Sequence, residues 1–296
     1  MLKKTLSLIL LTSVLVFIFN ACNEVNSPQQ DSFLADQNNS FETIDSDLFL
    51  LQEGGMDIDA AAGIFSIGWN EIFRPFHDES EIVGMAFAVA FGEHNDRHRF
   101  GINMGSVFIN YGDHSVELHK RGNDFRGVMY SLFRPPFGHS DRLLKFIPQE
   151  EYQFEVTGSD GFSQISFSLI SPSELIDITS HKHGDVIDHG QDLTVTWEGG
   201  DPHKKVALRL MPFFRRHNDH RDNHRRHPDQ IIFVILDSNP GHYTFTAKQI
   251  QELLKGTDTR HFVLGVSQMD FGEVEHKNGI LRTAMRNGNS VMLNIE

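Results

Sequence analysis

The sequence predicts an all-β protein that contains two tandem β-sandwich domains. Apolar residues recur at every second position or in short runs rich in Val, Ile, Phe and Thr, and Gly, Asn, Asp or Pro bound each run. Long amphipathic helical patterns do not interrupt these runs. The expected strands cover residues 83–91, 107–111, 115–119, 128–133, 152–157, 164–169, 193–198, 206–211, 231–236, 243–246, 262–267 and 291–295.

The Ser171-Pro172 pair ends the sixth of these runs and marks the predicted domain boundary. An N-terminal β-sandwich domain with a short extension is expected over residues 46–170. A second β-sandwich domain is expected over residues 171–296. Six strands and about 100 residues on each side suit a sandwich of the usual size.

One short helix is expected near residues 247–255. Thr246 and Gln249 have the spacing of a capping box, Leu253 lies on one face with other apolar residues, and Gly256 provides a stop. A second helical segment is expected within residues 58–73, where residues 60–62 are three consecutive alanines.

The first 22 residues have the pattern of an export signal. Lys3 and Lys4 precede an apolar run over residues 5–19, and Ala21 lies directly before Cys22, the single cysteine of the chain. The segment resembles a bacterial lipoprotein signal peptide, which implies removal of residues 1–21 and lipidation of Cys22 with palmitate-type acyl chains. Such chains hold a protein to a bilayer through their buried methylenes. The alternative is an ordinary signal peptide or signal anchor.

The resemblance implies an extracytoplasmic location in the bacterial cell envelope, with the lipid expected in the outer membrane. Residues 22–45 are rich in Asn, Gln, Ser and Asp and are expected to form a flexible tether behind the lipid. The formal charge of −14 argues against nucleic acid as a partner, because binding to phosphates needs a basic surface. One cysteine excludes an intrachain disulfide.

Two stretches of the second half resemble immunoglobulin-like domains of bacterial extracellular proteins, including the fibronectin type III-like group. Residues 178–197 read ITSHKHGDVIDHGQDLTVTW, and residues 237–245 read DSNPGHYTF. The resemblance implies that Trp197 is a core residue, that Tyr243 forms a tyrosine corner, and that Phe245 fills the place of a disulfide cysteine. A weaker version surrounds Tyr152. The alternative for the Trp and Tyr rings is carbohydrate stacking.

The most unusual segment is PFFRRHNDHRDNHRRHP, over residues 212–228. On a helix, its histidines would share one face and could chelate zinc, copper or nickel. Its arginines favour contact with an anionic group or a glycan instead, and a solvated insertion is the third interpretation. His181 and His183 give a weaker metal hint, because alternate residues of a strand share a face. The candidate metal ligands are His217, His220, His224 and His227, and the candidate anion or glycan contacts are Arg215, Arg216, Arg221, Arg225 and Arg226.

Signatures of common catalytic sites are absent from the sequence, including G-x-S-x-G, the P-loop and H-E-x-x-H. The chain is therefore predicted not to be an enzyme and to need no cofactor. Its expected role is structural, or the binding of a ligand or an envelope protein. The alternatives are a metal-binding lipoprotein that uses the histidine-rich loop and a surface glycan-binding protein.

Overall fold

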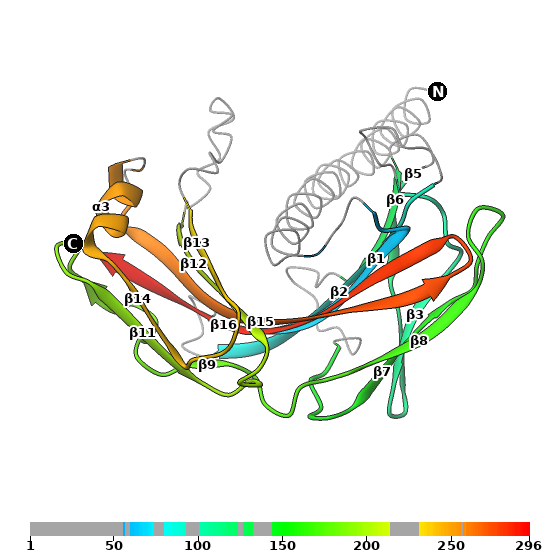
Figure 1. Cartoon of the computed structure of the whole chain (residues 1–296), viewed down its shortest axis with the longest axis horizontal. Coiled ribbons are helices and arrows are strands. Elements are labelled where there is room, and N and C mark those ends of the chain that lie inside the picture. The colour runs from blue at the N-terminus through cyan, green and yellow to red at the C-terminus, as the bar shows by residue number, and fades with distance from the viewer. Residues whose placement is uncertain are drawn as a thin grey trace, which may run out of the picture. The chain divides into compact units, whose positions relative to one another are not determined.

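The computed structural model describes residues 56, 60–73, 80–92, 101–123, 127–132, 144–213, 231–255, 257 and 259–296. These residues belong to a compact unit that runs from Phe49 to Glu296. The fold is an all-β sandwich, as predicted (Figure 1). The strands are β1 (Gly63–Phe73), β2 (Ser80–Ala90), β3 (Val107–Tyr111), β4 (His114–Glu117), β5 (His119–Asn123), β6 (Gly127–Leu132), β7 (Glu151–Val156), β8 (Ile165–Ile170), β9 (Asp177–Ile178), β10 (Val186–Ile187), β11 (Leu193–Glu198), β12 (Lys205–Pro212), β13 (Ile232–Leu236), β14 (His242–Phe245), β15 (His261–His276) and β16 (Gly279–Ile295), and the helix is α3 (Ala247–Lys255).

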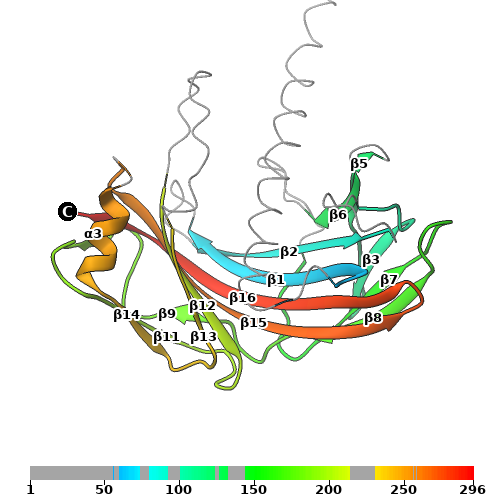
Figure 2. The same cartoon turned by 45° about the horizontal axis from the view of Figure 1, so that its top comes forward.

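A single nine-stranded sheet runs through the described part of the chain, in the order β13-β12-β15-β16-β1-β2-β6-β5, with β10 paired to β16. Its central element is the long hairpin β15–β16, whose strands pair from His261 opposite Asn294 to His276 opposite Gly279. Residues 262–269 of β15 pair antiparallel with β12. On the other side of the hairpin, residues 281–289 of β16 pair in parallel with β1. Both views show this hairpin passing from beside β12 to beside β1 (Figures 1 and 2).

Two smaller sheets cover one face of the long sheet, one over each half. The first is β4-β3-β7-β8, and the second is β14-β11-β9. The buried apolar residues form two clusters, to which β16 contributes Leu281 and Met285 in one case and Leu293 and Ile295 in the other. These four positions are all odd-numbered, and alternate residues of a strand share a face. Both cores therefore lie against the same face of one strand.

The first core contains a group of packed aromatic rings among its aliphatic residues. Phe154 packs edge-on against Phe65 and stacks on Phe167, with ring centroids 5.5 and 5.3 Å apart. The hydroxyl of Tyr152 donates a hydrogen bond to the Lys145 carbonyl (2.5 Å) and accepts one from the Ile147 amide (3.1 Å). This contact with the upstream backbone is the geometry of a tyrosine corner. Burial raises the pKa of Tyr152 to about 12, so its hydroxyl remains a donor at neutral pH.

The second core has the strand order of an immunoglobulin-like sandwich. Strands β9, β11 and β14 form one sheet, while β12, β13, β15 and β16 belong to the other, as strands A, B and E face C, F and G in that fold. Trp197 is a buried core residue, as predicted, and its indole N–H donates to Asn239 (2.7 Å). Tyr243 packs edge-on against the buried Phe245, but the tyrosine-corner contact expected of it is formed in the first half by Tyr152.

Helix α3 confirms the capping-box prediction. The Gln249 amide donates to the Thr246 hydroxyl oxygen (3.3 Å), and the Gln249 side chain accepts from the Thr246 amide (2.9 Å). Ile250 and Leu253 are buried against the second core.

The expected helix within residues 58–73 is wrong, because residues 63–73 form β1. Between β2 and β16, residues 63–73 gain backbone hydrogen bonds on both sides, and this pairing begins directly after the three alanines. The strands expected over residues 262–267 and 291–295 are both parts of much longer strands. The boundary at residue 171 stays a prediction, and the hairpin β15–β16 contributes to the cores on both sides of it.

Candidate functional site

Polar side chains interrupt the apolar face of the hairpin between the two cores. They are Gln268 and Asp270 on β15 and Asn287 and Asn289 on β16, which we call the polar waist. Gln268 lies opposite Asn287 in the register, and both are buried. Since 287 and 289 continue the odd-numbered series of β16, the polar waist faces the same side as the two cores.

Hydrogen bonds from the polar waist hold the connecting segments against the long sheet. The side-chain amide of Gln268 donates to the Asp201 carbonyl (2.6 Å), and its side-chain oxygen accepts from the Asp201 amide (2.9 Å). The side-chain oxygen of Asn287 accepts from the Ile176 amide (2.9 Å). These bonds satisfy polar groups that would otherwise be costly to bury.

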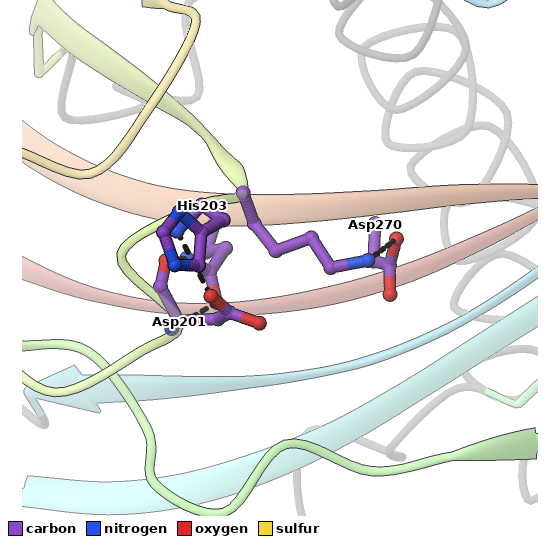
Figure 3. Close-up of polar contacts among 5 residues, drawn as sticks. Asp201, His203 and Asp270 are labelled. Atoms are coloured by element: carbon purple, nitrogen blue, oxygen red, sulfur yellow. Dashed lines mark hydrogen bonds and ion pairs between the residues drawn. The ribbon is translucent and has the colours of Figure 1, made fainter.

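The turn before β12 places further charged groups beside the polar waist. The Asp201 carboxylate accepts a hydrogen bond from the His203 amide (2.8 Å), and the Lys204 ammonium forms an ion pair with Asp270 (2.7 Å; Figure 3). Gly199 makes the turn possible: its φ is +78°, and a Cβ there would lie 2.1 Å from the Leu175 carbonyl oxygen. A side chain at this position would therefore clash with the backbone.

A cleft of about 170 Å³ opens at this point. Ligand pockets for small organic molecules are usually about 300–1,000 Å³, so this cleft matches a single polar side chain better than a whole substrate. Its groups can donate and accept hydrogen bonds and form ion pairs. The lining residues are Gln149, Ile170, Ser171, Pro172, Ser173, Asp201, Lys204, Gln268, Asp270, Met285 and Asn287.

Three carboxylates lie at the other side of the polar waist. The side-chain amide of Asn289 donates to both Glu71 (3.0 Å) and Asp177 (2.8 Å), and Asp177 lies opposite Glu198 in the β9–β11 pair. Burial, and then the nearby Glu71 and Glu198, raises the pKa of Asp177 above its usual 3.8. Within the described ranges, no group of three or more His, Cys, Asp or Glu side chains has an arrangement that could hold a metal ion.

The candidate residues named from the sequence fall mostly outside this region. Cys22, the four histidines of the predicted metal site and the five arginines all lie outside the described residues, so those assignments stay predictions. His181 and His183 lie in an irregular segment and a turn, and not on the strand that their metal hint required. In the part of the chain that the structure describes, no helix has the length and apolar character needed to cross a bilayer.

Sequence reasoning missed the polar waist and its cleft. The lining residues come from three separate segments of the chain, within residues 149–173, 201–204 and 268–287, which meet only in the folded protein. Two signals were available. The Gly199-Gly200-Asp201-Pro202 run indicates a tight turn, and the runs SQMD and RNGNS break the apolar alternation of the two long strands.

No protein-family model matches the chain, and no curated protein matches its sequence. Several solved structures are similar. The chicken CNTN1 FN1–FN3 domains match with 8% identity over 71% of this chain and 60% of that chain, at a TM-score of 0.20. The fibronectin(III)-like modules of Clostridium thermocellum CbhA match with 11% identity over 81% of this chain and 92% of that chain (TM-score 0.23), and DIP-gamma IG1+IG2 matches with 10% identity over 81% and 99% (TM-score 0.18). The match spans less than two thirds of the CNTN1 fragment. The strand order of this chain, and not these matches, defines its fold.

Proposed function

We propose that this chain is a non-catalytic lipoprotein of the bacterial cell envelope, anchored in the outer membrane by lipid on Cys22. The polar tether over residues 22–45 then carries a body of two β-sandwiches with a structural or partner-binding role. Support for the anchor comes from the signal-like residues 1–22, in which the single cysteine follows the apolar run.

The observation that carries the structural or binding role is the hairpin β15–β16, which supplies residues to both cores. Two sandwiches that share the same strands present their surfaces in a constant arrangement, which suits a spacer or a binding platform. The cleft beside this hairpin is about 170 Å³ and is lined by groups that hydrogen-bond to one another. That size favours contact with another protein surface over enclosure of a substrate.

A glycan platform built on Trp and Tyr rings receives little support from the burial of these residues. Both tryptophans and three of the four tyrosines are buried, and Tyr243 is half-buried. Sugar stacking needs an accessible ring face. The metal-binding and glycan-binding alternatives therefore depend on the loop over residues 214–230, which lies outside the described residues.

Substitution of Cys22 by Ala tests the anchor. Lipid attachment predicts that the native chain partitions into membranes and incorporates a radiolabelled or alkyne-bearing palmitate, whereas Cys22→Ala becomes unlabelled and accumulates in the uncleaved form. Ser27→Ala, in the tether, is the matched control and should leave labelling unchanged. Equal labelling and processing of Cys22→Ala would contradict the proposal.

Isothermal titration separates the alternatives. The mature chain, stripped of metal and carrying Cys22→Ser for solubility, is titrated with zinc, copper and nickel beside a variant with His217, His220, His224 and His227 changed to Ala. A structural or partner-binding role predicts no stoichiometric binding that depends on these histidines. Micromolar or tighter binding that disappears in the variant would make metal binding the function.

A further inference from the structure

Strand β8 forms an open edge of the four-stranded sheet β4-β3-β7-β8. It pairs with β7 along its whole length, from Ile165 opposite Val156 to Ile170 opposite Glu151. Among the strands that the structure describes, none pairs with its other side. The backbone amides and carbonyls on that side are therefore available to another strand.

The composition of β8 does nothing to block such pairing. Its sequence is ISFSLI, with no charge, no Pro and no Gly, and Ile170 is 65% exposed, the highest value among the exposed large apolar residues. Natural sheets usually protect edge strands with charged residues, Pro or bulges. The edge strands β4 and β5 follow that rule, because they contain Glu117 and the pair Lys120 and Arg121.

The edge strand β13 is also uncharged, but its environment differs. Every side chain of β13 is half-buried, so both of its faces are partly covered. In β8, burial alternates strictly: Ile165, Phe167 and Leu169 are half-buried toward the first core, while Ser166 and Ser168 are exposed. The outer face of β8 is thus as accessible as its edge.

Hydrogen bonds fix the chain at both ends of β8. After the strand, the Ser171 hydroxyl donates to the Ile147 carbonyl (2.5 Å) and accepts from the Glu150 amide (2.9 Å). Before the strand, the Ser163 carbonyl is hydrogen-bonded to the His276 ring (3.2 Å) at the end of β15. A strand held in this way loses little conformational entropy when another strand is added.

We propose that β8 is a homodimerisation strand, which pairs antiparallel with β8 of a second copy of this chain. Self-complementarity of the strand favours this occupant. Pairing centred on Phe167 places Ile165 opposite the partner's Leu169 and Ser166 opposite the partner's Ser168. The apolar face of each sheet then continues into the other, the serines meet on the outer face, and no charge is buried. The dimer joins two four-stranded sheets edge to edge.

Lysine substitution on the edge tests the pairing without touching the core. The experiment uses the mature chain with Cys22→Ser, followed by sedimentation equilibrium over a range of concentrations. The native strand is expected to give a monomer–dimer equilibrium, and hydrogen exchange over residues 165–170 is expected to slow as concentration rises. Ser168→Lys should weaken the dimer by at least about tenfold, because the two copies then bring like charges together on the outer face beside the joined edges.

The matched control is Gln153→Lys, since Gln153 lies directly opposite Ser168 on the inner strand β7 and is also exposed. It should leave the dimer intact. Ile170→Lys is a second edge variant, in which the lysine lies opposite Glu151 of β7. It should also weaken the dimer, and it keeps the test valid if Ser168→Lys fails to fold. A native chain that stays monomeric, a dimer that survives both edge variants, or equal weakening by Gln153→Lys would each overturn the proposal.

Discussion

The two cores that pack against the long sheet differ in which parts of the chain supply their residues. The second core consists of residues between Ile176 and Ile295, and nearly all its buried members are aliphatic. The first core contains more rings, its residues come mostly from positions before 170, and it also includes Leu281 and Met285 from β16. The first core is therefore incomplete until the last strand has been made, whereas the second depends only on its own half.

Each core contains one tryptophan, which makes the comparison measurable. Trp69 donates its indole N–H to the Leu144 carbonyl (3.3 Å) in the first core, and Trp197 donates to Asn239 in the second. The shared hairpin predicts that damage to one core reaches the other.

The largest effect is expected from Phe154→Ala, which removes a fully buried ring from the first core. The loss should be about 3–5 kcal/mol in the free energy of unfolding. Denaturant unfolding followed by fluorescence in Trp69→Phe and Trp197→Phe backgrounds should show both remaining tryptophans shifting to the same lower midpoint. Leu264→Ala, in the second core, is the reciprocal control and should likewise lower the midpoint of both tryptophan signals. If only the Trp69 signal moves, the cores unfold independently.

A smaller effect is expected at the turn that holds the polar waist. Gly199→Ala combines a left-handed backbone with a clash against the Leu175 carbonyl, and should cost about 2–4 kcal/mol. Gly184→Ala is the matched control, because its φ is similar (+88°) but nothing lies within 4 Å of the added carbon. It should cost only about 1 kcal/mol. Equal thermal shifts for the two variants would show that backbone conformation alone, without the clash, decides the loss.

The smallest effect is expected from Asp177→Asn, beside the polar waist. Burial and two neighbouring carboxylates raise the pKa of Asp177, so its ionised form destabilises the fold. Its contribution to stability is complete below pH 3.8 and is lost as the pH rises through the higher folded pKa. The variant keeps an oxygen for Asn289 and should melt at a slightly higher temperature at pH 7, by less than about 1 kcal/mol.

The advantage of Asp177→Asn should vanish at pH 3, where the native aspartate is itself neutral. Thermal unfolding at both pH values measures this difference. A gain at pH 3 equal to that at pH 7 would mean that charge is not the cause.

The sequence by itself determined the elements whose signals are local. Strands β3 and β11 begin and end at the predicted residues, because each is a short alternating run bounded by turn residues. Helix α3 follows from the capping box at Thr246 for the same reason. The burial of Trp197 was implied by the resemblance of residues 178–197 to immunoglobulin-like domains.

Only the tertiary structure decided how these elements share a sheet. Glu71 and Asn289, which lie opposite each other in β1 and β16, are 218 residues apart, and no local pattern specifies such a pairing. Pairing on both sides made a strand of residues 63–73, directly after three alanines that favour helix, and it extended β15 and β16 through the polar waist, where the apolar alternation stops. The physical reason is that backbone hydrogen bonds between strands require no particular side chain, so long-range pairing can override a weak local preference.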